Sequence, residues 1–206
     1  MKPEVFQDIL NESNFLNAEL IQDNKFHFYH EGGVYRVRMP KQKELSEVNK
    51  AKNSFYVELL KTPNALSKDN LKKLLKESQG IDIEVMELEL KELEESLYKV
   101  YLDLAGKKDA NEEGIQKCKD KVSEINDKRF KLIEKISSYL TPSIEVQIEN
   151  HYMEQLASIC TDKLENSEKE EWKKVWNSFE EFMNDESTLR LYAVSLLAKL
   201  MMGVNA

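Results

Sequence analysis

The sequence predicts a mainly α-helical protein, a helical bundle with one small β-hairpin near its N-terminus. Three observations predict this class. Apolar residues recur every three or four positions over most of residues 41–206, which is the period of a helix face. Only residues 25–39 alternate along the chain with the period of a strand. Six glycines and four prolines in 206 residues are too few for the many turns of an all-β protein.

The N-terminal part is expected to contain the hairpin and short helices. Residues 1–24 carry apolar side chains at near-helical spacing, which predicts a short first helix. Two alternating runs then flank Gly32 and Gly33, and glycine permits the positive φ of a tight turn. A proline ends the second run, and residues 41–61 follow with one continuous apolar stripe, which predicts a helix.

The middle of the chain is predicted to form an antiparallel coiled-coil hairpin (about 83–140). Before it, Ser67 is expected to cap a short helix that Gly80 ends. Residues 83–105 and 111–140 then repeat apolar side chains at alternating spacings of three and four, which is a heptad seam. Because only a short polar linker joins the two segments, they are expected to fold back on each other.

The C-terminal part is predicted to be helical throughout. Ser143 is expected to cap a long helix, and Ser167, with Glu170 three residues later, predicts another through a capping box. Residues 189–200 form the last predicted helix. The expected organisation is an N-terminal hairpin with short helices in residues 1–80, a helical hairpin in 81–142 and C-terminal helices in 143–206.

Charge is distributed unevenly along the chain. The whole chain carries −8, yet residues 25–43 contain five basic residues and one acidic residue, a net +4. The overall negative charge disfavours non-specific nucleic-acid binding, because phosphates would be repelled by most of the surface. Arg36 and Arg38, on one face of the predicted hairpin, leave a nucleic-acid-binding regulator as an alternative.

No motif predicts catalysis, a metal or a cofactor. His27 and His30 lie three apart in a predicted strand, so their side chains point to opposite faces and would not share an ion. Cys118 and Cys160 occupy apolar positions of helical patterns, where cysteine acts as a small hydrophobe and no disulfide is expected. No phosphate-binding loop or nucleophile elbow is present. We therefore expect a protein that is not an enzyme and that binds no cofactor.

The candidate contact residues are aromatic and basic. They are Arg36 and Arg38 on the hairpin, and Trp172, Trp176 and Phe179 on the helix predicted after Ser167. This aromatic stripe fits either a protein core or a hydrophobic groove for a partner helix. Its acidic flank would suit a partner with a basic amphipathic face.

Two stretches resemble a known family. They are FHFYHEGGVYRVRMPKQKE, which starts at Phe26, and SKDNLKKLLKESQGIDIEV, which starts at Ser67. With the helix between them, they resemble tail-assembly chaperones of tailed bacteriophages. Such proteins often open with a short strand pair that ends at a proline and continue with helices rich in Glu and Lys. The resemblance covers residues 26–104, and residues 111–206 depart from the compact form of that family.

The resemblance implies a non-catalytic chaperone that covers the apolar stripes of a long helical client, such as a tape-measure protein, until tail tube subunits replace it. A virion structural subunit (ring, neck or baseplate) that self-assembles as a homo-oligomer through the same helices is the main alternative. The most apolar window, residues 191–204, is too short to span a bilayer, so no membrane is expected. The expected location is the host cytoplasm, or the virion for the structural alternative.

Overall fold

The computed structural model describes residues 21–22, 24–106, 112–166 and 169–203. Within these ranges the protein is mainly α-helical with a small antiparallel sheet, so the predicted fold class is confirmed. The short helix expected in residues 1–24 falls almost entirely outside them. No helix in the described ranges combines the length and the apolar character that crossing a membrane requires.

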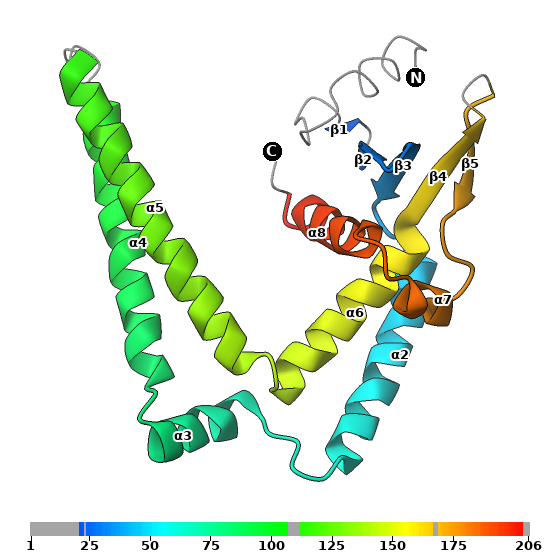
Figure 1. The fold of residues 1–206 in the computed structure, drawn as a ribbon, viewed down its shortest axis with the longest axis horizontal. Coiled ribbons are helices and arrows are strands. Elements are labelled where there is room, and N and C mark those ends of the chain that lie inside the picture. The colour runs from blue at the N-terminus through cyan, green and yellow to red at the C-terminus, as the bar shows by residue number, and fades with distance from the viewer. Residues whose placement is uncertain (1–20, 23, 107–111, 167–168, 204–206) are drawn as a thin grey trace. The chain divides into compact units, whose positions relative to one another are not determined.

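Figure 1 shows the helices and strands in chain order. The strands are β1 (Ile21–Gln22), β2 (Lys25–His30), β3 (Gly33–Arg38), β4 (Thr161–Asn166) and β5 (Glu171–Lys174). The helices are α2 (Gln42–Lys61), α3 (Lys68–Gln79), α4 (Ile83–Gly106), α5 (Glu112–Leu140), α6 (Ile144–Cys160), α7 (Phe179–Asn184) and α8 (Leu189–Met201).

The chain divides into two compact units. Unit 1 contains the described residues of Met1–Glu58 and Ile148–Ala206, and unit 2 is Leu59–Gln147. The sequence predicted three consecutive segments instead. The two ends of the chain group together in unit 1 because β3, from the N-terminal part, pairs with β4, from the C-terminal part.

The sheet of unit 1 has the strand order β1-β2-β3-β4-β5, and its neighbouring strands are antiparallel. The predicted β2–β3 hairpin is confirmed, with Phe28 opposite Tyr35. Its two-residue turn places both Glu31 (φ 42°) and Gly32 (φ 82°) in the left-handed region. Two positive φ angles are typical of the turn that matches the twist of paired strands.

One prediction for the C-terminal part is wrong. The helix expected after Ser167 is replaced by a second hairpin, β4–β5, followed by the short helix α7. Thr161 lies opposite Val37 and Asp162 opposite Arg36, so β4 continues the sheet along the free edge of β3. Pairing with a strand more than 120 residues away decides the local structure here, and a periodicity read along the chain does not contain that information.

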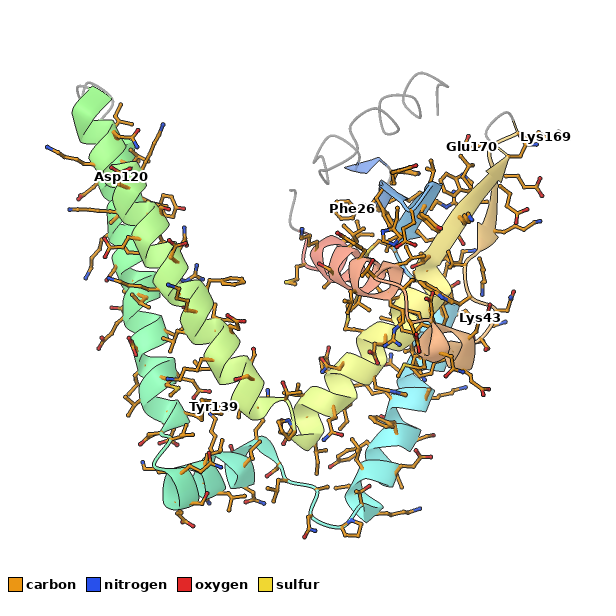
Figure 2. The ribbon with its side chains drawn as sticks, in the orientation of Figure 1. Phe26, Lys43, Asp120, Tyr139, Lys169 and Glu170 are labelled. Atoms are coloured by element: carbon orange, nitrogen blue, oxygen red, sulfur yellow. The ribbon has the colours of Figure 1, made fainter. Side chains whose placement is uncertain are left out.

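The core of unit 1 lies between one face of the sheet and the helices. Phe26, whose position Figure 2 labels, and Val37 are buried on this face, and α8 packs against β2 and β3. Leu156 of α6 and Phe182 of α7 are fully buried in the same cluster. Both cysteines are free and buried, as their apolar positions predicted.

Unit 2 has a smaller core, built where three helices meet. Leu71 and Leu75 of α3 pack with Ile83 of α4 and Leu140 of α5. The helix ends follow the sequence signals, since the Ser67 hydroxyl accepts a hydrogen bond from the backbone N–H of Asn70. Beyond this cluster, α4 and α5 lie side by side as the predicted helical hairpin (Figure 1). In Figure 2, Asp120 marks the end of α5 far from the cluster and Tyr139 the end near it.

Candidate partner-binding surfaces

The two arginines predicted to bind a partner are engaged within unit 1. Arg38 donates two hydrogen bonds to the carboxylate of Glu44, at 2.9 and 2.8 Å. Arg36 Nε donates to Asp162 Oδ2 at 2.8 Å. The Arg38 guanidinium also donates to the backbone oxygen of Ile159 at 3.2 Å. These contacts join β3 to β4 and to the neighbouring helices α2 and α6.

Titration of this cluster follows from its contacts. The hydrogen bonds from Arg38 lower the pKa of Glu44 to about 2, and partial burial opposes this shift. The same hydrogen bonds raise the pKa of Arg38. Burial raises the pKa of the Cys160 thiol to about 12, so this thiol stays protonated and is a poor nucleophile. The arginines therefore serve the fold of unit 1, and the positive charge expected for nucleic-acid contact is largely neutralised.

The three predicted aromatic contact residues occupy different surroundings. The guanidinium of Arg36 lies 4.4 Å from the ring centre of Trp172, a cation–π contact on the sheet. Trp176 is buried, and its indole N–H donates to Asp185 Oδ2 at 2.7 Å. The ring of Phe179 meets the ring of His151 edge-on at 5.0 Å. Burial lowers the pKa of His151.

Trp176 and Phe179 share one hollow on the surface of unit 1. Its volume is about 280 Å³, and its apolar lining consists of these two side chains with Val48 and Ile159. Polar side chains, among them Glu47 and Lys174, also line it. A pocket for a drug-sized ligand is usually larger, about 300–1,000 Å³. The structure thus joins two of the five predicted contact residues in one concave site, while Arg36 and Arg38 lie outside its lining.

A second exposed surface lies on the α4–α5 hairpin. In heptad terms, positions a and d of each helix face the other helix. Leu93 and Leu97 of α4, and Ile125 and Leu132 of α5, occupy such positions and are half-buried. The seam that the sequence predicted is therefore formed within one molecule.

Arg129 interrupts this seam at an a position and shows how the two helices are aligned. Its Nη1 donates to Asn126 Oδ1 at 3.1 Å and its Nη2 to Glu94 Oε1 at 3.3 Å. Asn126 of α5 and Glu94 of α4 are both e positions. One guanidinium reaches both, so the e positions of the two antiparallel helices lie on the same flank of the hairpin.

This flank carries large apolar side chains that face solvent. Tyr98 and Tyr101 lie three residues apart at b and e positions of α4, and Phe130 and Ile133 do the same on α5. Residues three apart are neighbours on a helix surface. Phe130 is 71% exposed and Tyr98 65%, and all four side chains are exposed. We call these four residues the apolar flank.

Charges surround the apolar flank asymmetrically. Acidic residues predominate at the neighbouring b, e and f positions: Glu84, Glu87, Glu95, Asp120, Asp127 and Glu134, against Lys91 and Lys119. On the opposite flank, positions c and g of α5 carry Lys117, Lys121, Lys128, Lys131 and Lys135 against Glu124, whereas those of α4 carry Glu89, Glu92 and Asp103 against Lys99. The hairpin therefore has one apolar flank with acidic borders and an opposite flank on which lysines of α5 face acidic residues of α4.

The sequence contains a signal for the apolar flank, and this signal lies outside the predicted seam. Tyr98, Tyr101, Phe130 and Ile133 are large apolar residues outside positions a and d of a clear heptad pattern. On an isolated two-helix hairpin such positions face water, so large apolar residues there point to contact with a further polypeptide.

Comparison of the chain with protein-family models, with curated proteins and with solved structures found no match. Within the described ranges, no three His, Cys, Asp or Glu side chains are grouped so that they could hold a metal ion.

Proposed function

We propose that this protein is a non-catalytic assembly chaperone that holds an amphipathic helix of a client on the apolar flank. The client class is a long helical protein such as a phage tape-measure protein, and the proposed place of action is the host cytoplasm. The observation that carries the proposal is the row of four exposed apolar side chains beside the α4–α5 seam. A client helix laid along it would complete a three-helix arrangement, in which each helix buries its apolar stripe.

Expected affinity fits a chaperone that must release its client. Burying a fully exposed large apolar side chain stabilises a complex by about 1.5–3 kcal/mol. Because these four side chains are only 39–71% exposed in the free protein, together they contribute about 3–7 kcal/mol. Association itself costs about 4–15 kcal/mol in lost freedom of motion. The net affinity is modest, which allows assembly partners to displace the chaperone.

Charge narrows the class of client. The acidic borders of the apolar flank would attract a helix whose apolar stripe is edged by lysine or arginine. The same borders would repel an acidic helix. The acidic borders would also repel the phosphates of nucleic acid, so nucleic acid is disfavoured as the ligand of this surface.

The test uses the full chain and a synthetic amphipathic helix with a leucine stripe and lysine edges. Fluorescence anisotropy of the labelled peptide should show saturable binding that Phe130→Ser weakens at least tenfold. Leu191→Ser is the matched control, because Leu191 of α8 is also 71% exposed but lies in unit 1. Equal binding by both variants and the wild type would contradict the proposal.

A sedimentation experiment separates the chaperone from the virion structural subunit. A chaperone of this kind stays a small species at micromolar concentration until the peptide is added. Ordered self-association that Phe130→Ser abolishes would instead assign the apolar flank to contacts between copies of this chain.

A further inference from the structure

The apolar flank is divided in its middle by one polar cluster. The guanidinium of Arg129 lies between the e positions of both helices, held by Asn126 and Glu94. The Arg129 side chain is 27% exposed although its Nε is buried, so only its outer N–H groups face solvent. Phe130 and Ile133 lie to one side of this cluster along the hairpin, and Tyr98 and Tyr101 to the other.

We propose that Arg129 selects client helices that carry an asparagine or glutamine side chain at the centre of their apolar stripe. This inference rests on the proposed function, because it concerns the same docking surface. A helix that covered the apolar flank would exclude water from the guanidinium. Nη1 and Nη2 each donate only one of their two N–H groups, to Asn126 and to Glu94. The remaining outer N–H groups would then need an acceptor from the client, since a buried donor without a partner weakens binding.

The preferred acceptor is a neutral amide. Glu94 already balances the charge of Arg129 at 3.3 Å. A carboxylate from the client would bring an additional negative charge into a covered site whose borders are acidic. An amide oxygen accepts the hydrogen bond without that charge, and a leucine at the same place accepts none.

Helix geometry defines the expected pattern in the client. Tyr98 lies four residues beyond Glu94, and Ile133 four residues beyond Arg129 in the opposite direction along the hairpin. At 1.5 Å per residue each is about 6 Å from the cluster. The client should therefore carry apolar residues seven or eight positions apart, with the amide three or four positions after the first. A polar group in an apolar seam fixes register in the same way in coiled coils.

The experiment compares three lysine-edged peptides that differ only at the central position, which is Gln, Leu or Glu. We expect wild-type protein to bind the Gln peptide about tenfold more tightly than the Leu peptide, the ratio that one satisfied buried donor gives. The Glu peptide should bind more weakly than the Gln peptide. The double variant Arg129→Met with Glu94→Gln should lose the preference for Gln and bind the Leu peptide at least as tightly.

Each outcome has a distinct meaning. Binding of no peptide by the wild type would overturn the proposed function. Equal binding of the Gln and Leu peptides would overturn only the role of Arg129, as would a double variant that keeps the preference. Circular dichroism of the variant checks the fold, and Met at an a position of the seam should preserve the helices.

Discussion

Phe182 in unit 1 and Phe130 in unit 2 are both phenylalanines, but one is buried and the other faces solvent. Phe182 is fully buried, and its ring packs against Trp176 at 4.7 Å. Phe130 is 71% exposed on a helix whose partner helix lies on another side. Unit 1 buries Trp176 and Phe182 in its own core, although Tyr56, Tyr192 and Leu191 of the same unit are exposed. Unit 2 exposes Phe130 beside a seam of two helices, and we propose that this ring contacts another molecule.

The same contrast applies to charge. In unit 1, Arg36 and Arg38 are paired with acidic side chains of neighbouring elements. In unit 2, the lysines of α5 and the acidic borders of the apolar flank are arranged on opposite flanks of one hairpin. A conspicuous residue in the sequence therefore has a different meaning in each unit, and only its surroundings separate a structural role from a binding role.

The largest expected effect is a loss of stability on replacing a buried phenylalanine, and it tests the contrast between the two units directly. Phe182→Ala should lower the free energy of unfolding of unit 1 by about 3–5 kcal/mol, because it leaves a cavity in the core. Phe130→Ala should change stability by less than about 0.5 kcal/mol, as for exposed positions generally. Urea unfolding followed by tryptophan fluorescence measures the first effect, since both tryptophans lie in unit 1. Far-UV circular dichroism follows both units.

A large loss of helix stability in Phe130→Ala would show that this ring is part of a core, and the contrast between the units would fail. A small effect of Phe182→Ala would show that unit 1 is loosely packed.

The next effect concerns the ion pair of Arg38 with Glu44. The pKa of Glu44 is about 2 in the folded protein, below its ordinary value of 4.5. The folded state therefore binds fewer protons, so this stabilisation is present above pH 4.5 and is lost as the pH falls toward 2. After allowance for solvent screening, the loss should be about 2 kcal/mol.

Tryptophan fluorescence during urea unfolding at several pH values measures that loss in unit 1. Glu44→Gln should flatten the pH dependence over this range, because it removes the titrating group. An unchanged profile in the variant would mean that other carboxylates cause the acid sensitivity.

Elements with local signals were predictable from the sequence. The β2–β3 hairpin follows from alternation around its glycines, and α3 from a serine cap and a glycine stop. The β4–β5 hairpin was not predictable in this way. Its strands form because β3 offers a free edge, and that edge comes from a distant part of the chain.

The candidate site was predictable only in part. The sequence indicated the helical hairpin, but as contact residues on the C-terminal part it indicated Trp172, Trp176 and Phe179. Contact with other proteins stays a prediction. Trp176 proved to be a core residue with a hydrogen bond to Asp185. To predict the apolar flank, one must know the heptad positions and also that the two helices of the seam belong to the same molecule. Before that is known, an off-seam tyrosine cannot be distinguished from a core residue.

The smallest predicted effect is a change in the stability of unit 2, whose core is small, when the glycine that ends α3 is replaced. Gly80 ends α3 with φ 68°, and its N–H donates to the carbonyl oxygens of Leu75 and Lys76. Gly80→Ala should cost about 1 kcal/mol, because alanine disfavours this left-handed conformation although its Cβ would meet no atom within 4 Å.

Gly106→Ala is the matched control within the same unit. Gly106 ends α4 without a positive φ, and its added Cβ also has open space. Alanine there should stabilise the helix by up to about 0.5–1 kcal/mol, so the two substitutions should have opposite signs in thermal unfolding followed by circular dichroism. If both substitutions changed the stability of unit 2 in the same direction, the conformation of the helix ends would not decide its stability, and side-chain packing elsewhere in unit 2 would. In that case its exposed side chains would contribute to its own stability, and the apolar flank would be less free to bind a client.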